Sequence, residues 1–304
     1  MCWAEELTGN SNVSTKLTDQ TNVDVEVARG FGDEWSRFDQ SALEEAQKQR
    51  IFSEYFAIFP QEVLTKAATG ADFGCGSGRW ASVVAPRVGK LICVDASHDA
   101  LEVTRRNLKE HTNCEFIEAS IDTALIAYGS LDFGYSLGVL HHVPDTAAGI
   151  RSCVSKLRPG APFLLYLYYS FDNQPRWYRW LWLLSETGRA CVSRLPYSLR
   201  YFASQVIAAG VYWPLARITA LLQRCGLKVQ SFPLAYYRDK SFYVMRTDAL
   251  DRFGTRLEQR FTRAEIATMM AEAGLERITF SNHPPYWCAL GYRCATAVNK
   301  RCMG

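Results

Sequence analysis

The sequence predicts an α/β fold, a doubly wound sheet of mainly parallel strands with helices on both faces. Gly74, Gly76 and Gly78 follow a short apolar strand and lead into a helical segment, which is typical of a ligand-binding strand, turn and helix. Asp95 ends the next apolar strand, which begins at Lys90. Apolar strands then alternate with helical segments, and this alternation favours parallel strands joined by crossover helices.

Length and composition bound the domain organisation. The chain has 304 residues, 48% hydrophobic and 21% charged, which suits one large soluble domain or one domain with an insertion. No uncharged apolar run reaches about 18 residues, so we expect no transmembrane helix. Residues 1–23 lack the features of a secretion signal or transit peptide. The net charge of +3 selects no class of partner.

The cysteines give a prediction about compartment and metal binding. The chain has ten of them, without a C-x-x-C pair. This pattern favours reduced structural thiols over disulfides or a metal centre. We therefore expect a cytoplasmic protein without a metal site.

The N-terminal part is expected to precede the sheet and to cover it. Residues 1–29 are rich in Thr, Asn, Asp and Val and are predicted to form a flexible arm. An aromatic segment follows at 30–38. Residues 41–59 have the apolar spacing of an amphipathic helix, which Pro60 ends.

The glycine spacing distinguishes two classes of nucleotide site. A dinucleotide fingerprint requires G-x-G-x-x-G, and counting from Gly74 its last position is occupied by Arg79. The register therefore argues against NAD and FAD. Asp95 lies 17 residues beyond Gly78, where a carboxylate at the end of the second strand accepts hydrogen bonds from both ribose hydroxyls.

The alternation of helices and strands continues after Asp95. Residues 97–109 and 147–157 are predicted to be helices, and 114–119, 130–137 and 163–169 the third, fourth and fifth strands. Gly138 follows the fourth strand, and His141 and His142 come next. The first and fourth strands of a doubly wound sheet end at the same crevice, so these histidines are candidates for the site.

Two motifs resemble those of the class I S-adenosylmethionine-dependent methyltransferases. The family pattern D-x-G-x-G-x-G, with an acid at the end of the second strand, is matched by Asp72, Gly74, Gly76, Gly78 and Asp95. The fourth strand of the family ends in a V-L-H-H-x-P-D run, and Val-Leu-His-His-Val-Pro-Asp stands at that place here.

The resemblance implies the architecture of the whole chain. It implies a Rossmann-like, doubly wound seven-stranded sheet of six parallel strands, with an antiparallel seventh between the fifth and the sixth. The core would comprise 30–169 and 260–296, with a helical insertion at 170–259 after the fifth strand and a C-terminal tail at 297–304. Thr262 and Glu265 predict a capping box before the last two strands.

The resemblance also implies S-adenosyl-L-methionine as cofactor and S-adenosyl-L-homocysteine as product. The implied binding residues are Asp72, Gly74, Cys75, Gly76, Gly78, Asp95, Ala96, Ser120, Ile121, Leu137 and Trp35. Trp35 belongs to an F-G-x-x-W segment similar to one in related small-molecule methyltransferases. With Phe38, it either closes over the sulfonium by cation–π attraction or only covers the sheet.

Two details of the cofactor site stay open. Arg50 is a candidate partner for the methionyl carboxylate. Many relatives carry an acid for the adenine amino group directly after the third strand, whereas this chain has Ser120-Ile121-Asp122. Either Asp122 still serves, or Ser120 and the backbone bind the adenine.

The catalytic candidates are His142, His141 and Tyr168. A histidine at this strand end could take a proton from a hydroxyl or amine acceptor, or it could be a cap or a buried strut. Tyr168 is a substrate contact, a base or ordinary strand filling. Adjacent histidines without a third ligand suit zinc poorly, so no metal is predicted.

The insertion is where acceptor specificity is expected. Residues 171–226 contain seven arginines, no lysine and two acids, among many Trp and Leu residues. Three interpretations remain: a helical lid whose arginines face water; a lid whose arginines bind a carboxylate or phosphate of the acceptor; and a face at 176–224 that makes peripheral contact with a membrane. Pro214 is expected to break a helix, and 227–253 to form a short hairpin or loop.

The predicted function is transfer of a methyl group from S-adenosylmethionine to an O or N atom of a small molecule or of a natural-product, glycan or lipid-linked intermediate. The alternative is a non-methylating enzyme, such as a cyclase or an aminocarboxypropyl transferase, or a non-catalytic subunit that binds the cofactor. A nucleic-acid partner is not expected, because no nucleic-acid-binding module is recognised. The sequence leaves the oligomeric state open.

Overall fold

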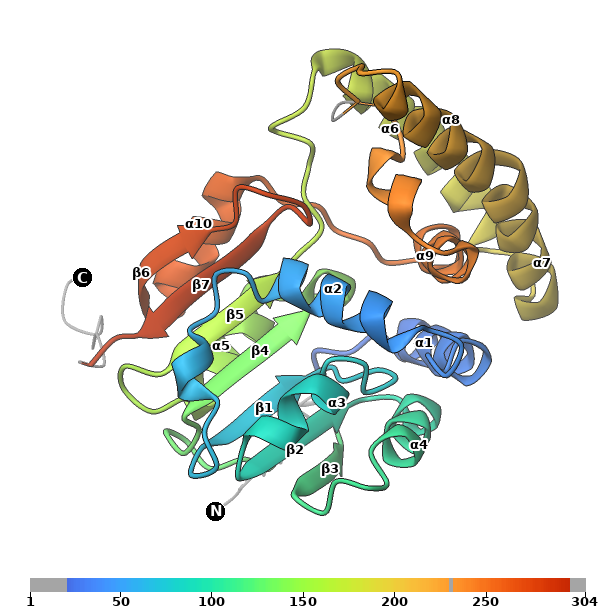
Figure 1. Ribbon diagram of the computed structural model, residues 1–304. Helices are drawn as coiled ribbons and strands as arrows, with labels where there is room; N and C mark the ends of the chain where they lie inside the picture. Colours follow the sequence, from blue (N-terminus) through green and yellow to red (C-terminus); the bar gives the residue numbers. More distant parts are fainter. Residues whose placement is uncertain (1–20, 230–231, 296–304) are drawn as a thin grey trace, which may run out of the picture.

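The computed structural model describes residues 21–229 and 232–295. Its centre is a seven-stranded sheet in the order β3-β2-β1-β4-β5-β7-β6, with helices on both faces (Figure 1). Strand β7 is antiparallel to β5 and β6, and the other neighbours are parallel. The predicted doubly wound sheet and its antiparallel seventh strand are confirmed. The strands are β1 (Thr69–Phe73), β2 (Lys90–Asp95), β3 (Cys114–Glu118), β4 (Phe133–Leu137), β5 (Pro162–Tyr166), β6 (Leu275–Phe280) and β7 (Cys288–Arg293).

Helices cover the sheet and extend beyond the carboxyl ends of its strands (Figure 1). Those of the core are α1 (Val25–Arg37), α2 (Glu45–Tyr55), α3 (Ala81–Val84), α4 (His98–Asn107), α5 (Thr146–Lys156) and α10 (Arg263–Glu272). Those of the insertion are α6 (Arg176–Val192), α7 (Tyr197–Ile207), α8 (Trp213–Arg224) and α9 (Phe242–Gly254). Short turns of helix are η1 (Gln61–Val63), η2 (Ala85–Arg87), η3 (Leu140–His142), η4 (Ala208–Tyr212) and η5 (Ala235–Asp239).

Alternating residues of the buried strands fill one core on each face of the sheet. On β2, Leu91 and Cys93 belong to the core that includes residues of α2 and α4, whereas Ile92 and Val94 belong to the core that includes residues of α5 and α10. Side chains that alternate along a strand point to opposite faces. Both faces are therefore covered, as expected for a mainly parallel sheet.

Helix starts are fixed by side-chain caps close to the site. Asp145 accepts a hydrogen bond from the backbone N–H of Ala148 at the start of α5. The predicted capping box of α10 is confirmed, because Thr262 accepts from the Glu265 N–H and the Glu265 carboxylate accepts from the Thr262 N–H.

The N-terminal boundary differs from the prediction. Helix α1 begins at Val25, inside the segment 1–29 that was expected to be a flexible arm. Asp24 causes this start, since its carboxylate accepts from the N–H groups of Glu26 and Val27 at 3.0 Å each. Residues 1–20 of the predicted arm, and the tail at 297–304, lie outside the described residues.

The two ends of the insertion lie side by side. The Phe261 N–H donates to the Tyr168 carbonyl at 2.9 Å, and the Ser170 N–H donates to the Phe261 carbonyl at 3.0 Å. The chain therefore leaves the core directly after β5 and returns to the same place. The insertion has an apolar centre of its own, formed by Ala208, Tyr212, Ala216, Met245 and Ala249.

Two predictions about the insertion were wrong. Where a short hairpin or loop was expected at 227–253, the described residues form η5 and most of α9, and Ser241 caps α9 by accepting from the Val244 N–H. Pro214 does not break the helix. It lies at the start of α8, directly after the π-helical turn η4, where a helix tolerates a residue without an N–H.

The helix that runs through Pro214 bears on the expectation of no transmembrane helix. The 28 residues Tyr197–Arg224 form one helix with a window of mean hydropathy 1.3, long and apolar enough to cross a membrane by length and composition. This helix contains no uncharged apolar run of about 18 residues, because Arg200 and Arg217 interrupt it. Only 22% of that window is buried within the protein.

Candidate functional site

A cavity opens at the carboxyl ends of β1, β2 and β4, against α1. It comprises about 880 Å³ not filled by atoms, part of which is open to solvent. Its lining comes from four parts of the chain. These are residues of 22–35, the glycine loop with Arg79 and Trp80, the segments after β2 and β3, and Leu137, Gly138, Val139, His142 and Val143.

The glycine loop approaches its neighbours closely. Gly74 has φ of 85° and Gly76 φ of 56°, values that L side chains rarely adopt. A Cβ on Gly74 would lie 2.4 Å from Val139 Cγ1, and a Cβ on Gly76 would lie 2.8 Å from Trp35 Nε1. The absence of side chains therefore lets Trp35 and Val139 border the same cavity as the loop.

Asp95 joins the loop to the end of β2. Its Oδ2 accepts from the Gly76 N–H at 2.8 Å, and its Oδ1 accepts from the Ser97 N–H at 2.9 Å. Burial raises the pKa of Asp95, and these backbone hydrogen bonds oppose the shift. Each carboxylate oxygen keeps a second lone pair for a ligand hydroxyl.

Two predicted binding residues lie behind the cavity. Asp72 is buried and is not among the lining residues, and its burial raises the pKa to about 8. Gly78 packs against Thr104 and donates its N–H to the Cys75 carbonyl at 2.8 Å. Both residues support the glycine loop on the side away from the cavity. The other predicted binding residues line the cavity: Gly74, Cys75, Gly76, Asp95, Ala96, Ser120, Ile121, Leu137 and Trp35.

The segment after β3 bears on the choice between Asp122 and Ser120. Ala119, Ser120 and Ile121 line the cavity, and Asp122 does not. The Asp122 carboxylate instead accepts from the Asn22 N–H at 3.1 Å. The geometry thus favours Ser120 and the backbone for contact with a ligand in this part of the cavity.

At the other end of the cavity, Arg79 is the cation that sequence reasoning missed. Its guanidinium lies 4.2 Å from the Trp80 ring centroid, and its buried Nε has no hydrogen-bond partner. Arg50, proposed for the methionyl carboxylate, is exposed on α2 and does not line the cavity. Phe38 is buried against Tyr201 and Tyr243 and does not reach the cavity either. The place of Arg79 after the last loop glycine was a signal for its role.

The structure separates the two histidines. His142 lines the cavity, whereas His141 is fully buried and stacks on the Tyr168 ring with centroids 3.9 Å apart. Burial lowers the pKa of His141 well below its ordinary value, so this ring is neutral. His141 has the surroundings of a packed strut.

Hydrogen bonding fixes the tautomer of neutral His142. Its Nδ1 lies 2.7 Å from the Leu257 carbonyl oxygen, which can only accept, so Nδ1 carries the proton. The buried Nε2 atom is then an acceptor. Within residues 21–229 and 232–295 no group donates to it, and Asp251 Oδ1 lies 3.7 Å away.

The insertion at 170–259, which forms a lid over the carboxyl ends of the strands, supplies Asp251 to this site. Asp251 lies on α9, and its Oδ2 accepts a hydrogen bond from the Tyr168 hydroxyl. Burial, with the neighbouring Asp251 as a second cause, raises the pKa of Tyr168 well above its ordinary value, which makes the hydroxyl a donor and a poor base. Tyr168 does not line the cavity. The distance in sequence between Asp251 and His142 explains why sequence reasoning missed their contact.

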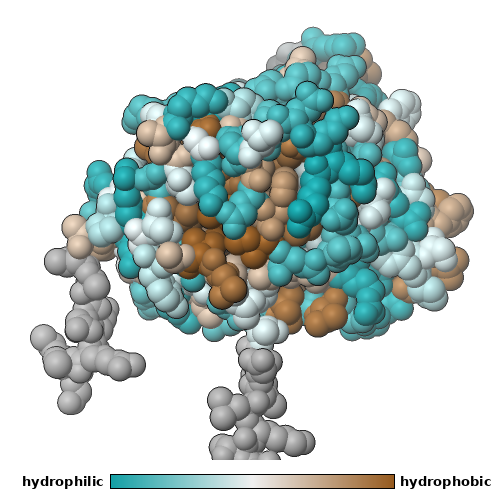
Figure 2. Space-filling model, turned by 90° about the horizontal axis from the view of Figure 1, so that it is seen from below, coloured by the Kyte–Doolittle hydropathy of each residue, from teal (hydrophilic) through white to brown (hydrophobic). Residues whose placement is uncertain are grey.

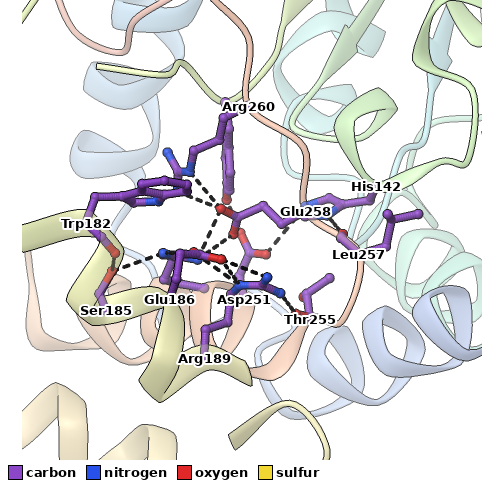
Figure 3. Close-up of polar contacts among 12 residues, drawn as sticks. His142, Trp182, Ser185, Glu186, Arg189, Asp251, Thr255, Leu257, Glu258 and Arg260 are labelled. Carbon is purple, nitrogen blue, oxygen red and sulfur yellow. Dashed lines mark hydrogen bonds and ion pairs between the residues drawn. The ribbon is translucent and has the colours of Figure 1, made fainter. Parts of the chain in front are cut away.

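An ion network holds the lid against the segment that returns to the core (Figure 3). Glu258 pairs with Arg252 at 3.1 Å and with Arg260 at 2.8 Å. Glu186 on α6 pairs with Arg252 and, at 2.8 Å, with Arg189. These arginines are therefore committed to ion pairs. Of the arginines at 171–226 that were considered as an anion clamp, Arg189 is thus already paired.

Carboxylates dominate the junction of α1 and α9. Glu34 is buried with its Oε1 unpartnered, and burial together with the charges of Asp251 and Asp248 raises its pKa well above the ordinary value. Burial raises the pKa of Asp248 to about 6. The lid side of the site is thus rich in acids.

Comparison with known proteins agrees with this geometry. Residues 71–160 match a family model described as a methyltransferase domain. Residues 71–160 form a methyltransferase domain of the class I S-adenosylmethionine-dependent type. The matched residues run from β1 to the turn before β5, and they include the glycine loop, Asp95 and both histidines.

Curated relatives are similar to about a third of this chain. A protein named ubiquinone biosynthesis O-methyltransferase from Xanthomonas campestris pv. campestris (strain B100) is 31% identical over 105 residues, which are 34% of this chain and 44% of that one. One of the same name from Vibrio parahaemolyticus is 34% identical over 91 residues, 29% of this chain and 39% of that one. The chain thus spans less than half the length of these relatives. A crystal structure of a putative methyltransferase from Bacillus halodurans aligns with TM-score 0.44 and 15% identity, over 78% of this chain and 71% of that one.

The cavity of the methyltransferase fits the family cofactor. The loop leaves no Cβ at Gly74 or Gly76, Asp95 offers acceptors at the end of β2, and the unpartnered Arg79 Nε offers a donor. Ribose hydroxyls and a carboxylate are the complementary groups of S-adenosylmethionine. Within 21–229 and 232–295, no three His, Cys, Asp or Glu side chains are arranged to hold a metal ion.

Proposed function

We propose that this protein transfers a methyl group from S-adenosylmethionine to an oxygen or nitrogen atom of a small-molecule acceptor. The observation that carries the proposal is that the glycine loop, Asp95 and His142 border one cavity, and that the buried Nε2 of His142 has no hydrogen-bond partner among the described residues. When bound, S-adenosylmethionine supplies an electrophilic methyl group. The protein must hold it, orient the acceptor and take up a proton.

Five residues would hold the cofactor. The remaining lone pairs of Asp95 would accept from the ribose hydroxyls, and Arg79 would pair with the methionyl carboxylate. Ser120 and the adjacent backbone would contact the adenine, with Ile121 against its face. Trp35 on α1 would close the cavity beside Gly76.

His142 would act as the base. An acceptor O–H or N–H would donate to Nε2, and the proton would pass to this atom as the new bond to carbon forms. The Leu257 carbonyl keeps the other proton on Nδ1 and fixes the ring. Asp251, at 3.7 Å from Nε2, would stabilise the imidazolium, and Tyr168 positions Asp251.

The surroundings of the base favour an acceptor that donates hydrogen bonds. Glu34, Asp248 and Asp251 are carboxylates, and Arg189, Arg252 and Arg260 are already paired. A neutral hydroxyl compound or an amine suits this charge better than an anion. The names of the curated relatives support O-methylation of a biosynthetic intermediate. Their matches cover 34% and 29% of this chain, and the insertion after β5 would determine which acceptor is used.

Product analysis tests the proposal. The protein is incubated with S-adenosylmethionine labelled on the methyl group and with fractions of a small-molecule extract. We expect S-adenosylhomocysteine to accumulate while the label moves to an acceptor. Formation of 5′-methylthioadenosine would instead identify a non-methylating enzyme, and turnover of neither kind with any fraction would favour a non-catalytic subunit.

A further inference from the structure

The outer side of the lid is unusually apolar. Among the residues that the structure describes, large exposed hydrophobic side chains lie at Val25, Leu125 and Tyr128, and all others lie between Trp177 and Phe242. On the face seen from below in Figure 2, hydrophilic residues surround an area of hydrophobic ones. The lid helices lie elsewhere, beyond the carboxyl ends of the strands (Figure 1). Large exposed apolar surfaces on folded proteins mark interaction sites.

The helix Tyr197–Arg224 has its large apolar residues on the outside. Ala208, Ala216 and Thr219 are buried against the rest of the lid. Phe202 and Leu221 instead are 66% and 60% exposed. Further exposed apolar residues of this helix are Leu199, Val206, Val211, Trp213, Leu215 and Ile218. A helix packed only in water shows the opposite arrangement.

Charge selects the chemistry of the partner. From Thr187 to Arg238 the chain has six arginines and one lysine, and no Asp or Glu. Arg194, Arg224 and Lys228 are exposed in this stretch. An apolar face with exposed cations beside it is complementary to a surface with an apolar interior and anionic groups at its edge.

We propose that the outer face of α6, α7 and α8 binds the surface of an anionic lipid bilayer. The apolar side chains enter the boundary between headgroups and acyl chains, and the exposed Arg194, Arg224 and Lys228 contact lipid phosphates. Trp177, Trp180 and Trp213 are exposed on these helices, and tryptophan favours this interface. This inference stands independently of the reaction proposed above.

The helix lies on the membrane and does not cross it. Its buried residues pack with Met245 and Ala249 of α9. A position across the membrane would separate these residues and disrupt the apolar centre of the lid. Arg217 also donates to the Lys240 carbonyl at 3.4 Å, which ties the middle of the helix to the segment before α9. An amphipathic helix with one face already covered is the usual form of an interfacial helix.

Co-sedimentation of the full chain with vesicles tests the proposal. Vesicles of phosphatidylcholine with about a third phosphatidylglycerol are compared with phosphatidylcholine alone. We expect binding to the anionic vesicles at about 0.1 M salt and weaker binding at about 0.5 M, because salt screens the arginines. The double variant Phe202→Gln with Leu221→Gln should partition at least about tenfold less. The control Leu125→Gln, 95% exposed outside the lid, should bind as the wild type does.

A second pair of variants tests the charges. Arg224→Gln with Lys228→Gln should lower partition about tenfold and reduce the salt dependence, whereas Arg106→Gln on α4 should change neither. Absence of wild-type protein from the anionic pellet at low salt would overturn the proposal. So would a wild-type dimer that Phe202→Gln dissociates and that binds no vesicles, since the face would then join two copies. Binding of S-adenosylhomocysteine, measured on the same samples, reports separately on the cofactor site and on folding.

Discussion

Replacing Gly74 by alanine is expected to weaken S-adenosylhomocysteine binding at least about 100-fold, or about 2.7 kcal/mol. The backbone at Gly74 has φ of 85°, which costs an alanine about 1–2 kcal/mol. The new Cβ would also lie 2.4 and 2.5 Å from the two methyl carbons of Val139. The loop must then move away from β4, and Gly76, whose N–H binds Asp95, moves with it. Isothermal titration of the ligand measures the loss.

Gly160→Ala is the matched control for this prediction. Gly160 has φ of 79°, and no atom lies within 4 Å of the position of a Cβ. The alanine there imposes the backbone strain of Gly74→Ala without a contact at the site. We expect a loss of about 1 kcal/mol in the free energy of unfolding and unchanged ligand binding. Equal loss of binding in both variants would mean that general destabilisation, and not the loop, controls the affinity.

Replacing His142 by alanine is expected to lower kcat by a factor of about 10²–10⁴ and to leave the Kd for S-adenosylhomocysteine unchanged. The Nε2 atom is the proton acceptor of the proposed reaction, and the ring makes no polar contact with the glycine loop or Asp95. Transfer of labelled methyl groups, with the extract fraction that supports it, gives kcat. Calorimetry gives Kd.

Two further variants sharpen the His142 prediction. Asp251→Asn keeps a hydrogen-bonding side chain but removes the charge beside Nε2, so we expect a smaller fall in kcat than for His142→Ala. His98→Ala removes an exposed histidine that pairs with Glu118 on the far side of β2, and it should retain full activity. Full activity of His142→Ala would assign this ring a purely structural role.

The loop and the strands were predictable because their constraints are local. Gly74, Gly76 and Gly78 all have positive φ, so the turn can be inferred from residue type alone. Asp95 and His142 follow apolar strands, and the carboxyl ends of such strands meet at one edge of the sheet. The antiparallel seventh strand came from the family resemblance, and the sheet order confirms it.

The lid was less predictable because long-range contacts decide its structure. Residues 227–253 have no strong helical signal, and α9 forms where Met245 and Ala249 meet the helix Tyr197–Arg224. The Asp251 contact with His142 depends on that packing and cannot be read from spacing. In the sequence, Arg79 indicates only that the dinucleotide motif is absent. The fold places this cation, directly after the glycine loop, against the cavity.

The most direct measurement of the cofactor site is titration of S-adenosylhomocysteine into the wild-type protein and into Asp95→Ala. The carboxylate of Asp95 holds the Gly76 N–H and offers the ribose acceptors, so both contributions disappear together. We expect one site per chain in the wild type and at least tenfold weaker binding in the variant, about 1.4 kcal/mol. No binding by the wild type, or equal affinity of the two proteins, would contradict the assignment of this cavity to S-adenosylmethionine.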